Sequence, residues 1–226
     1  MSYNRRIPAI TSNTFKGLRD VDFIDLWSNN ITSIADNAFI NLGKLDYLGL
    51  DSNKLTSVRA NEFVGLKNLF DLVLEDNQIA SIEEDSFRDL NKLSFLFLDF
   101  NKIQTIEREM FAHLDSLTFL TLSNNNIQFV ASRVFGYSPN LQQLSLANNN
   151  IAFIANNEFH DFKSLVLLSL LNNKLSYIDP NFAKGSTKLQ KICLGSNLFS
   201  NGFNINTSEF TNLNTFAIFS PTCASS

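Results

Sequence analysis

Apolar residues recur in one frame every 24 positions along most of this chain. From a leucine-like first position, each unit reads L-x-x-L-x-L-x-x-N-x-[IL]-x-x-[IV]-x-x-x-x-F-x-x-L-x-x. Units open at Val21, Leu45, Leu69, Leu93, Leu117, Leu141, Leu165, Leu189 and Leu213. Self-similarity at this period predicts a solenoid, in which each coil buries its apolar face only by stacking on its neighbours.

The first half of each unit predicts a short strand and the second half an apolar return path. Alternating leucines such as Leu48 and Leu50 are expected to point inward, and the residues between them outward. The return path carries an aliphatic pair, for example Ile79 and Ile82, and then a Phe at position 19. These Phe residues should form a continuous spine: Phe39, Phe63, Phe87, Phe111, Phe135 and Phe159.

Position 9 of every complete unit is asparagine. A buried amide has both donors and acceptors, so stacked Asn side chains are able to satisfy the backbone groups that each turn leaves unpaired. We therefore predict a structural ladder of these side chains. The residues are Asn29, Asn53, Asn77, Asn101, Asn125, Asn149, Asn173 and Asn197.

This frame resembles that of leucine-rich-repeat proteins. The 24-residue form with Phe at position 19 is similar to the class common in animal extracellular recognition proteins, including Toll-like receptor ectodomains, lamprey variable lymphocyte receptors and insect immune proteins. The resemblance implies an α/β solenoid, a horseshoe with a parallel concave β-sheet and an irregular or 3-10 convex side. It also implies partners on the concave face or an adjacent edge, and an extracellular location as a secreted protein or receptor ectodomain.

The repeat frame divides the chain into three predicted parts. Residues 1–20 form a partial N-terminal repeat, residues 21–212 form eight 24-residue repeats, and residues 213–226 form a partial ninth repeat or C-terminal cap. The later units are less regular, since Phe182 lies one place early in its unit. We interpret the chain as a fragment or a trimmed ectodomain, with a complete protein bearing unusual caps as the alternative.

Charge and composition bear on the class of partner. A net charge of −4 argues against nucleic acid or an anionic membrane as the main partner. No apolar run of about 20 residues is present, so no membrane insertion is expected. The two histidines, His113 and His160, fall on the convex side, and neither a glycine-rich phosphate loop nor a metal-ligand spacing occurs. We therefore expect no enzyme activity, no cofactor and no metal.

The two cysteines leave the redox compartment open. Cys193 falls at an outward strand position and Cys223 follows the last strand. If both kept the repeat frame they would lie too far apart to bridge, whereas a tail folded back on the sheet would permit a disulfide. Asn30 and Asn206 begin glycosylation motifs, but such motifs are expected by chance in a chain rich in Asn, Ser and Thr.

The outward strand residues of the first four units have a distinct chemistry. They include eight carboxylates and seven aromatic rings but no Lys or Arg. Asp51, Glu75 and Asp99 share position 7, and like charges on strands about 4.8 Å apart repel by about 0.9 kcal/mol in water. Carboxylates beside aromatic rings suit Lys or Arg through ion pairs and cation–π contacts. The candidate ligand-binding residues are Phe23, Asp25, Trp27, Tyr47, Asp51, Asp71, Glu75, Asp76, Phe95, Phe97, Asp99 and Phe119.

The sequence thus favours a non-catalytic module that binds a protein or peptide ligand with basic residues, in immune recognition or cell-surface adhesion. Several alternatives remain open at this point. One alternative is that this face is an ordinary solvated surface without a partner. A second is a homodimeric scaffold in which the aromatic residues pair two copies of the chain, and a third is an intracellular scaffold. A cation held by Asp51, Glu75, Asp76 and Asp99 is a further alternative, although these residues lack a recognisable calcium-loop spacing.

Overall fold

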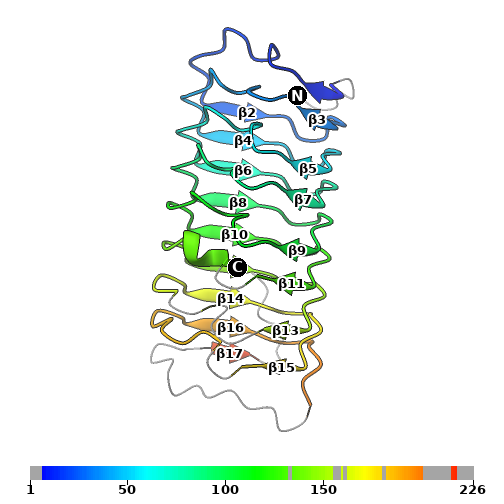
Figure 1. The fold of residues 1–226 in the computed structure, drawn as a ribbon, viewed down its shortest axis with the longest axis vertical. Helices are drawn as coiled ribbons and strands as arrows, with labels where there is room; N and C mark the ends of the chain where they lie inside the picture. Colours follow the sequence, from blue (N-terminus) through cyan, green and yellow to red (C-terminus); the bar gives the residue numbers. More distant parts are fainter. Residues whose placement is uncertain are drawn as a thin grey trace.

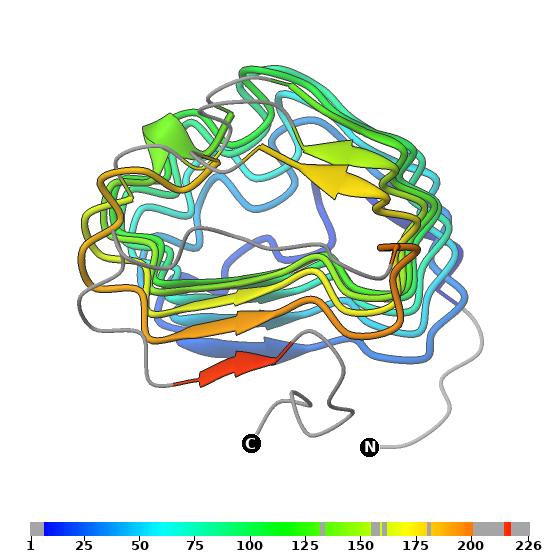
Figure 2. The same cartoon turned by 90° about the horizontal axis from the view of Figure 1, so that it is seen from below.

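The computed structural model is a solenoid with one coil for each 24-residue unit (Figure 1). The structure describes residues 7–131, 134–154, 159, 162–179, 182–200 and 215–217. Neighbouring coils pair in parallel at equivalent positions, so Leu72 lies opposite both Leu48 and Leu96. Viewed along the solenoid, the coils lie over one another (Figure 2). The solenoid predicted from the repeat is confirmed.

One long parallel sheet forms one side of every coil (Figure 2). The middle residue of a strand such as Leu72 is buried, while its two neighbours face outward, as the alternating pattern predicts. We call the surface formed by these outward residues and the turn residues that follow them the sheet face. The nine strands within the described chain are β2 (Phe23–Asp25), β4 (Tyr47–Gly49), β6 (Asp71–Val73), β8 (Phe95–Phe97), β10 (Phe119–Thr121), β12 (Gln143–Ser145), β14 (Leu167–Ser169), β16 (Lys191–Cys193) and β17 (Thr215–Ala217).

The return path carries two-residue strands that pair two at a time, β1 with β3, β5 with β7, β9 with β11 and β13 with β15. We call the surface along them the short-strand face. Otherwise this side is built from turns and one 3-10 helix, Val134–Tyr137, and no α-helix occurs in the described part of the chain. The short strands are β1 (Ala9–Ile10), β3 (Ser33–Ile34), β5 (Ser57–Val58), β7 (Ser81–Ile82), β9 (Thr105–Ile106), β11 (Phe129–Val130), β13 (Phe153–Ile154) and β15 (Tyr177–Ile178).

The predicted Phe spine fills the return side of the core. Phe63 and Phe87 stack with ring centroids 6.3 Å apart and planes 13° apart, and the series continues from coil to coil. Phe182 is also fully buried, but it meets Phe159 edge-on, at 88°. Each buried ring contributes about 1.5–3 kcal/mol, which makes the spine a large part of the stability.

The asparagine ladder is present as predicted. The Asn77 amide donates to the carbonyls of Leu74 (3.2 Å) and Glu75 (3.1 Å) in its own coil and of Leu50 (2.9 Å) in the coil before. Its oxygen accepts the backbone N–H of Leu55 at 3.0 Å, also in the preceding coil. One side chain therefore closes its own turn and joins two coils. Equivalent bonds are made by Asn53, Asn101, Asn125, Asn149, Asn173 and Asn197.

The residue before each ladder asparagine adopts a left-handed backbone, which turns the chain so that the amide enters the core. Most units place Ser, Asp or Asn there, and the latter two tolerate this conformation best. Unit four instead has Phe100, with φ of 54° and a ring that is 57% exposed. The column comprises Ser28, Ser52, Asp76, Phe100, Asn124, Asn148, Asn172 and Ser196.

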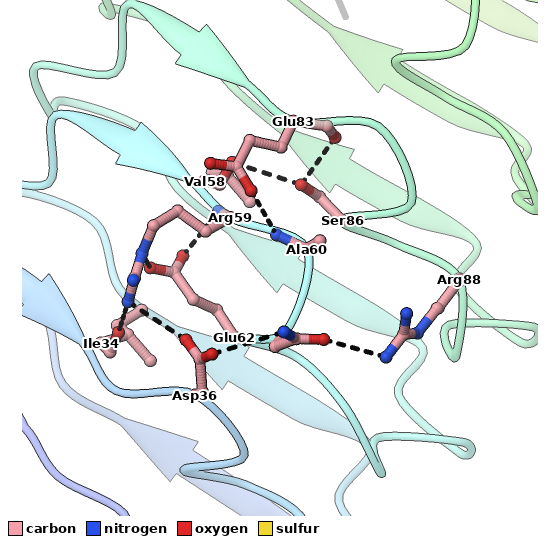
Figure 3. A network of polar contacts seen from close by, with 10 residues as sticks. Ile34, Asp36, Val58, Arg59, Ala60, Glu62, Glu83, Ser86 and Arg88 are labelled. Carbon is pink, nitrogen blue, oxygen red and sulfur yellow. Dashed lines mark hydrogen bonds and ion pairs between the residues drawn. The ribbon is translucent and has the colours of Figure 1, made fainter.

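A polar network on the return side ties the first three coils together (Figure 3). Glu62 is only 3% exposed, and its carboxylate accepts both the backbone N–H (3.1 Å) and the Nε–H (2.9 Å) of Arg59. Arg59 also donates to the carbonyl of Ile34 and pairs with Asp36 at 3.5 Å. In the third coil, Glu83 accepts the N–H of the residue after Arg59. Burial raises the pKa of Glu62, while the hydrogen bonds and charge of Arg59 oppose that rise.

The described part of the chain contains no helical segment with the length and hydrophobicity that a membrane span needs.

Replacing Asn101 with Ala tests the ladder. The change removes three donated hydrogen bonds and the one accepted from Ile79. At about 1 kcal/mol each, we expect urea unfolding to show a loss of about 3–4 kcal/mol. Asn126→Ala, at an exposed position in the next coil, is the control and should change stability by less than about 0.5 kcal/mol. Equal effects of the two changes would contradict the ladder's role.

Replacing Arg59 with Met tests the network. The loss of the guanidinium leaves the buried Glu62 carboxylate without its cation, and we expect a cost of about 2–3 kcal/mol. This is below the usual figure for fully buried pairs because the Arg59 side chain is 43% exposed. The double change Arg59→Met with Glu62→Leu should cost less than Arg59→Met alone in urea unfolding. Losses that simply add would show that the two groups are not coupled.

Candidate ligand-binding site

All twelve candidate residues lie on the sheet face, and none of them is buried. Register brings their position-3 members into one row, in which Phe23, Tyr47, Asp71, Phe95 and Phe119 lie on successive strands. The remaining candidates occupy positions 5, 7 and 8 of the same coils. The sheet thus brings together residues that are up to 96 positions apart in the sequence.

The first two coils form one aromatic contact. The rings of Phe23 and Tyr47 stack with centroids 4.4 Å apart and planes 8° apart. Gly49 makes this possible, because a Cβ at Gly49 would lie 3.0 Å from the Tyr47 hydroxyl and 3.0 Å from the Asp25 carboxylate. Tyr47 therefore lies across the backbone of its own strand. The repeat pattern gave no signal of this contact.

The third to fifth coils form a second aromatic cluster. Phe95, Phe97 and Phe119 lie with centroids 5.4 to 6.5 Å apart. Phe70, the residue just before β6, adds its ring at 5.4 Å from Phe95. Phe70 is not one of the twelve candidate residues, but its ring extends the cluster beside β6.

The carboxylates of this face are crowded and partly desolvated. Burial, followed by the charges of Asp99 and Asp51, raises the pKa of Glu75 above its ordinary value. Burial also raises the pKa of Asp51, assisted by the charges of Asp25 and Asp76, although a bond to its own backbone lowers it. The predicted column of like charges is therefore electrostatically unfavourable in the folded chain, with burial as the larger cause.

Asp99 differs from the other members of the column. It accepts hydrogen bonds from the Thr121 hydroxyl and the Ser123 backbone N–H, and Ser123 also contacts the Ser145 hydroxyl at 2.8 Å. Burial raises the pKa of Asp99 and these hydrogen bonds lower it, with burial the larger effect. Asp99 therefore begins a row of hydroxyl groups that leads into the C-terminal half of the face.

The described ion pairs lie off the sheet face. They join Lys44 to Asp20, Arg59 to Asp36 and Glu62, and His113 to Asp85. Within the part of the chain that the structure describes, no ion pair involves the six carboxylates among the candidates, although Asp76 accepts a hydrogen bond from Ser52. Nor do three or more His, Cys, Asp or Glu side chains gather there as metal ligands, so the four-carboxylate cation site is not formed.

A hollow of about 480 Å³ lies on the sheet face between the third and seventh coils. Glu75, Asp99, Phe97 and Phe119 form its N-terminal part. The rest is lined by hydroxyl and amide side chains such as Ser145 together with apolar residues such as Leu167 and Leu171. The acidic and aromatic candidates of the first two coils lie outside it. The hollow is thus centred further along the chain than the cluster of candidates.

Three exposed aromatic residues on the short-strand face were missed. Phe129 and Phe153 are 57% exposed and Tyr177 is 48% exposed. All three occupy position 13, where the first four units carry Ser33, Ser57, Ser81 and Thr105. A change from hydroxyl to aromatic residues in one column was a usable signal, but it becomes apparent only when the units are compared position by position.

The state of Cys193 is one of the two alternatives that the sequence left open. It is disulfide-bonded, as the alternative with a bridge requires, and it is fully buried although the frame gave it an outward strand position. Cys223, the other cysteine of the chain, lies outside the described residues. His160 and the Asn206 glycosylation motif lie outside them too, whereas His113 is an exposed residue of the return side that contacts Asp85.

The pattern and the geometry define a parallel-strand solenoid whose coils are joined by an asparagine ladder. The leucine-rich-repeat family model matches residues 1–55, 21–79, 71–127, 120–175 and 139–199, and so spans most of the chain. The chain belongs to the leucine-rich-repeat family. No curated protein matches it in sequence.

Several solved structures share the fold. The TLR13 complex with ssRNA13 is 29% identical, with a TM-score of 0.83 over 90% of this chain. The Drosophila Toll–Spatzle complex is 24% identical, with a TM-score of 0.81 over 89%, and a Leptospira interrogans leucine-rich-repeat protein, LIC12759, is 26% identical, with a TM-score of 0.61 over 91%. The chain spans 29%, 27% and 57% of the lengths of those three chains, respectively.

The TLR13 complex corrects the expectation that nucleic acid is excluded as a partner. Net charge was used to argue against nucleic-acid partners, yet TLR13, a solenoid of the same fold, is solved with a single-stranded RNA. A modest negative net charge is therefore not a valid ground for excluding nucleic acid in this fold. The distribution of charge over each face has to decide instead.

Replacing Glu75 with Gln tests whether the ionised carboxylates of the acidic column lower the stability of the fold. Because the folded-state pKa of Glu75 is raised, the folded chain binds this proton more tightly than the unfolded chain does. Ionisation therefore lowers stability as the pH rises from the ordinary value of 4.5 through the raised pKa. We expect Glu75→Gln to unfold at higher urea than the wild type at neutral pH, and the difference to vanish below that ordinary value.

Asp115→Asn is the control for this comparison, since Asp115 is an exposed carboxylate outside the sheet face. It should leave the unfolding midpoint nearly unchanged at both pH values. A Glu75→Gln protein that is less stable than wild type at neutral pH would show that this carboxylate contributes a favourable interaction instead.

Proposed function

We propose that this chain is a non-catalytic recognition module that binds a cationic protein or peptide on the sheet face. The observation that carries the proposal is a column of partly buried carboxylates that form no ion pair with any described residue, set beside exposed aromatic rings. Asp51 and Glu75 have raised pKa values because burial and neighbouring charges disfavour their ionised forms. A bound Lys or Arg would favour the ionised forms and so offset that cost.

The aromatic rings support the same class of ligand. Phe97 and Phe119 line the hollow together with Glu75 and Asp99, so one bound cation would contact both a carboxylate and a ring face. Phe100 is a bulky residue in a left-handed backbone that other units give to Ser, Asp or Asn. A Phe in this conformation does not stabilise the fold, and residues with a strained backbone are typical of functional surfaces.

The solved structures that share this fold support the broader role of ligand recognition. Toll is solved with the protein Spatzle, in a complex described as a hub in development and innate immunity, and TLR13 is solved with RNA. Ligand binding by solenoids of this fold is therefore established for those proteins. For this chain we infer an extracellular role in immune recognition or adhesion, and the acidic face favours a cationic ligand over a polyanion.

A labelled peptide of alternating Arg and Gly, with a Gln-for-Arg analogue, provides a direct test. We expect the wild type to bind the Arg peptide, and the affinity to fall as salt rises. The triple change Asp51→Asn, Glu75→Gln and Asp99→Asn should weaken binding about tenfold, since three ion pairs at about 0.5 kcal/mol each are lost. It should also flatten the salt dependence. Fluorescence anisotropy measures both quantities.

The matched control removes three carboxylates from the return side, by Glu107→Gln, Glu109→Gln and Asp115→Asn. It has the same net charge as the triple variant and should bind as the wild type does. Urea unfolding confirms that both proteins are folded. Equal weakening by the two variants would mean that only net charge matters, and tighter binding of a single-stranded RNA than of the Arg peptide would overturn the proposal.

A further inference from the structure

The hollow on the sheet face changes in chemistry from its N-terminal end to its C-terminal end. Position 7 of the unit supplies one lining residue from each of five successive coils. In order, these residues are Glu75, Asp99, Ser123, Ala147 and Leu171, so the column passes from carboxylates through a hydroxyl and a methyl group to an isobutyl group. Backbone hydrogen bonds of 2.8 to 3.0 Å, from the residue after one member to the carbonyl of the next, keep the column in register.

Small side chains in the middle coils account for the depth of the hollow. Phe97 and Phe119 lie at its acidic end, and Leu167 and Leu171 lie at its apolar end. A volume of about 480 Å³ is within the usual range for ligand sites. The small residues between the two ends are Thr121, Ser123, Ser145, Ala147 and Ser169.

Charge is confined to the acidic end of the hollow. Among the described residues that line it, Glu75 and Asp99 carry the only charged side chains. Beyond the apolar end, β16 carries Lys191, which is the register partner of Leu167. A ligand cation is therefore attracted to the first end and repelled from the second, so the hollow is electrostatically directional.

We propose that the hollow binds an extended peptide segment with a basic residue and a large apolar residue four positions apart. This inference rests on the proposed function and names the part of the cationic ligand that the hollow recognises. The segment lies along the position-7 column, across the strands. Its basic side chain contacts Asp99 and the ring of Phe97, and its apolar side chain packs against Leu167 and Leu171.

The geometry of the sheet sets the spacing between the two side chains. Asp99 and Leu171 are three coils apart, and neighbouring strands lie about 4.8 Å apart, so roughly 14 Å separates the two positions. An extended chain advances about 3.4 Å per residue, and about four residues therefore span this distance. Hydroxyl and amide groups between the two ends, such as those of Ser145 and Asn148, are able to bond the backbone of the segment.

Fluorescence anisotropy with short labelled peptides tests the inference. The peptides place Arg and Leu on either side of three Gly or Ser residues, in both possible orders. Analogues replace Leu with Gln or shorten the spacer to one residue. We expect the better-bound order to bind the wild type about fivefold more tightly than either of its analogues, because only this peptide brings Leu to the apolar end while Arg meets Asp99.

The variant Leu167→Gln with Leu171→Ser should lose this preference for Leu and keep its affinity for the Gln analogue. The repeat accommodates both changes, since Gln143 and Ser123 occupy the same positions of neighbouring units. Phe153→Ser with Leu198→Asn is the matched control. It removes two exposed apolar side chains that do not line the hollow, and it should keep the fivefold preference.

Leu171→Glu tests the direction of the hollow. This change extends the acidic column to the apolar end, so a peptide with Arg at both positions should become a tighter ligand than the Arg–Leu peptide. Absence of that reversal would overturn the assignment of the apolar end.

The inference fails if the wild type binds the Leu peptide and its Gln analogue equally, or if the preference persists in the Leu167→Gln and Leu171→Ser variant. In both cases the proposed function stands, provided that the Asp51→Asn, Glu75→Gln and Asp99→Asn variant still loses affinity for Arg peptides. A wild type that binds none of the Arg peptides overturns the inference and the proposed function together.

Discussion

The fold depends on one amide side chain repeated at a fixed interval. A ladder asparagine such as Asn77 closes the turn of its own coil and accepts a backbone N–H from the coil before it, so turn geometry and coil stacking are fixed together. Its place in the unit requires a left-handed residue just before it. At the first coil the Asn29 oxygen is buried and accepts no hydrogen bond from the described residues, which shows how far each rung depends on its neighbour.

Because the inward Leu and Ile residues, the ladder and the Phe spine form the core, the outward positions are able to vary without changing the fold. The two faces use this freedom in opposite ways. The sheet face is acidic and aromatic in its N-terminal half and then carries hydroxyl and amide groups. The short-strand face carries Ser and Thr first and aromatic rings later. Exposed aromatic residues therefore lie at diagonally opposite regions of the solenoid.

Some features of the sheet face lower the stability of the fold. Desolvated carboxylates with raised pKa values and a bulky residue in a left-handed backbone both oppose folding. The repeated core supplies enough stability to tolerate them. The TLR13 and Toll complexes show that solenoids of this fold hold ligands as different as RNA and protein, so the chemistry of each face, and not the fold, sets the partner.

The sequence alone determined the frame, the ladder, the Phe spine and the face on which each candidate lies, because burial and hydrogen bonding repeat every 24 residues. Tertiary structure decided how individual side chains use that face. Tyr47 lies over Gly49, Asp99 is held by Thr121 and Ser123, and Cys193 is buried and bonded at an outward position. These outcomes depend on side-chain conformation and on neighbours in adjacent coils, which a periodic pattern of residue types does not encode.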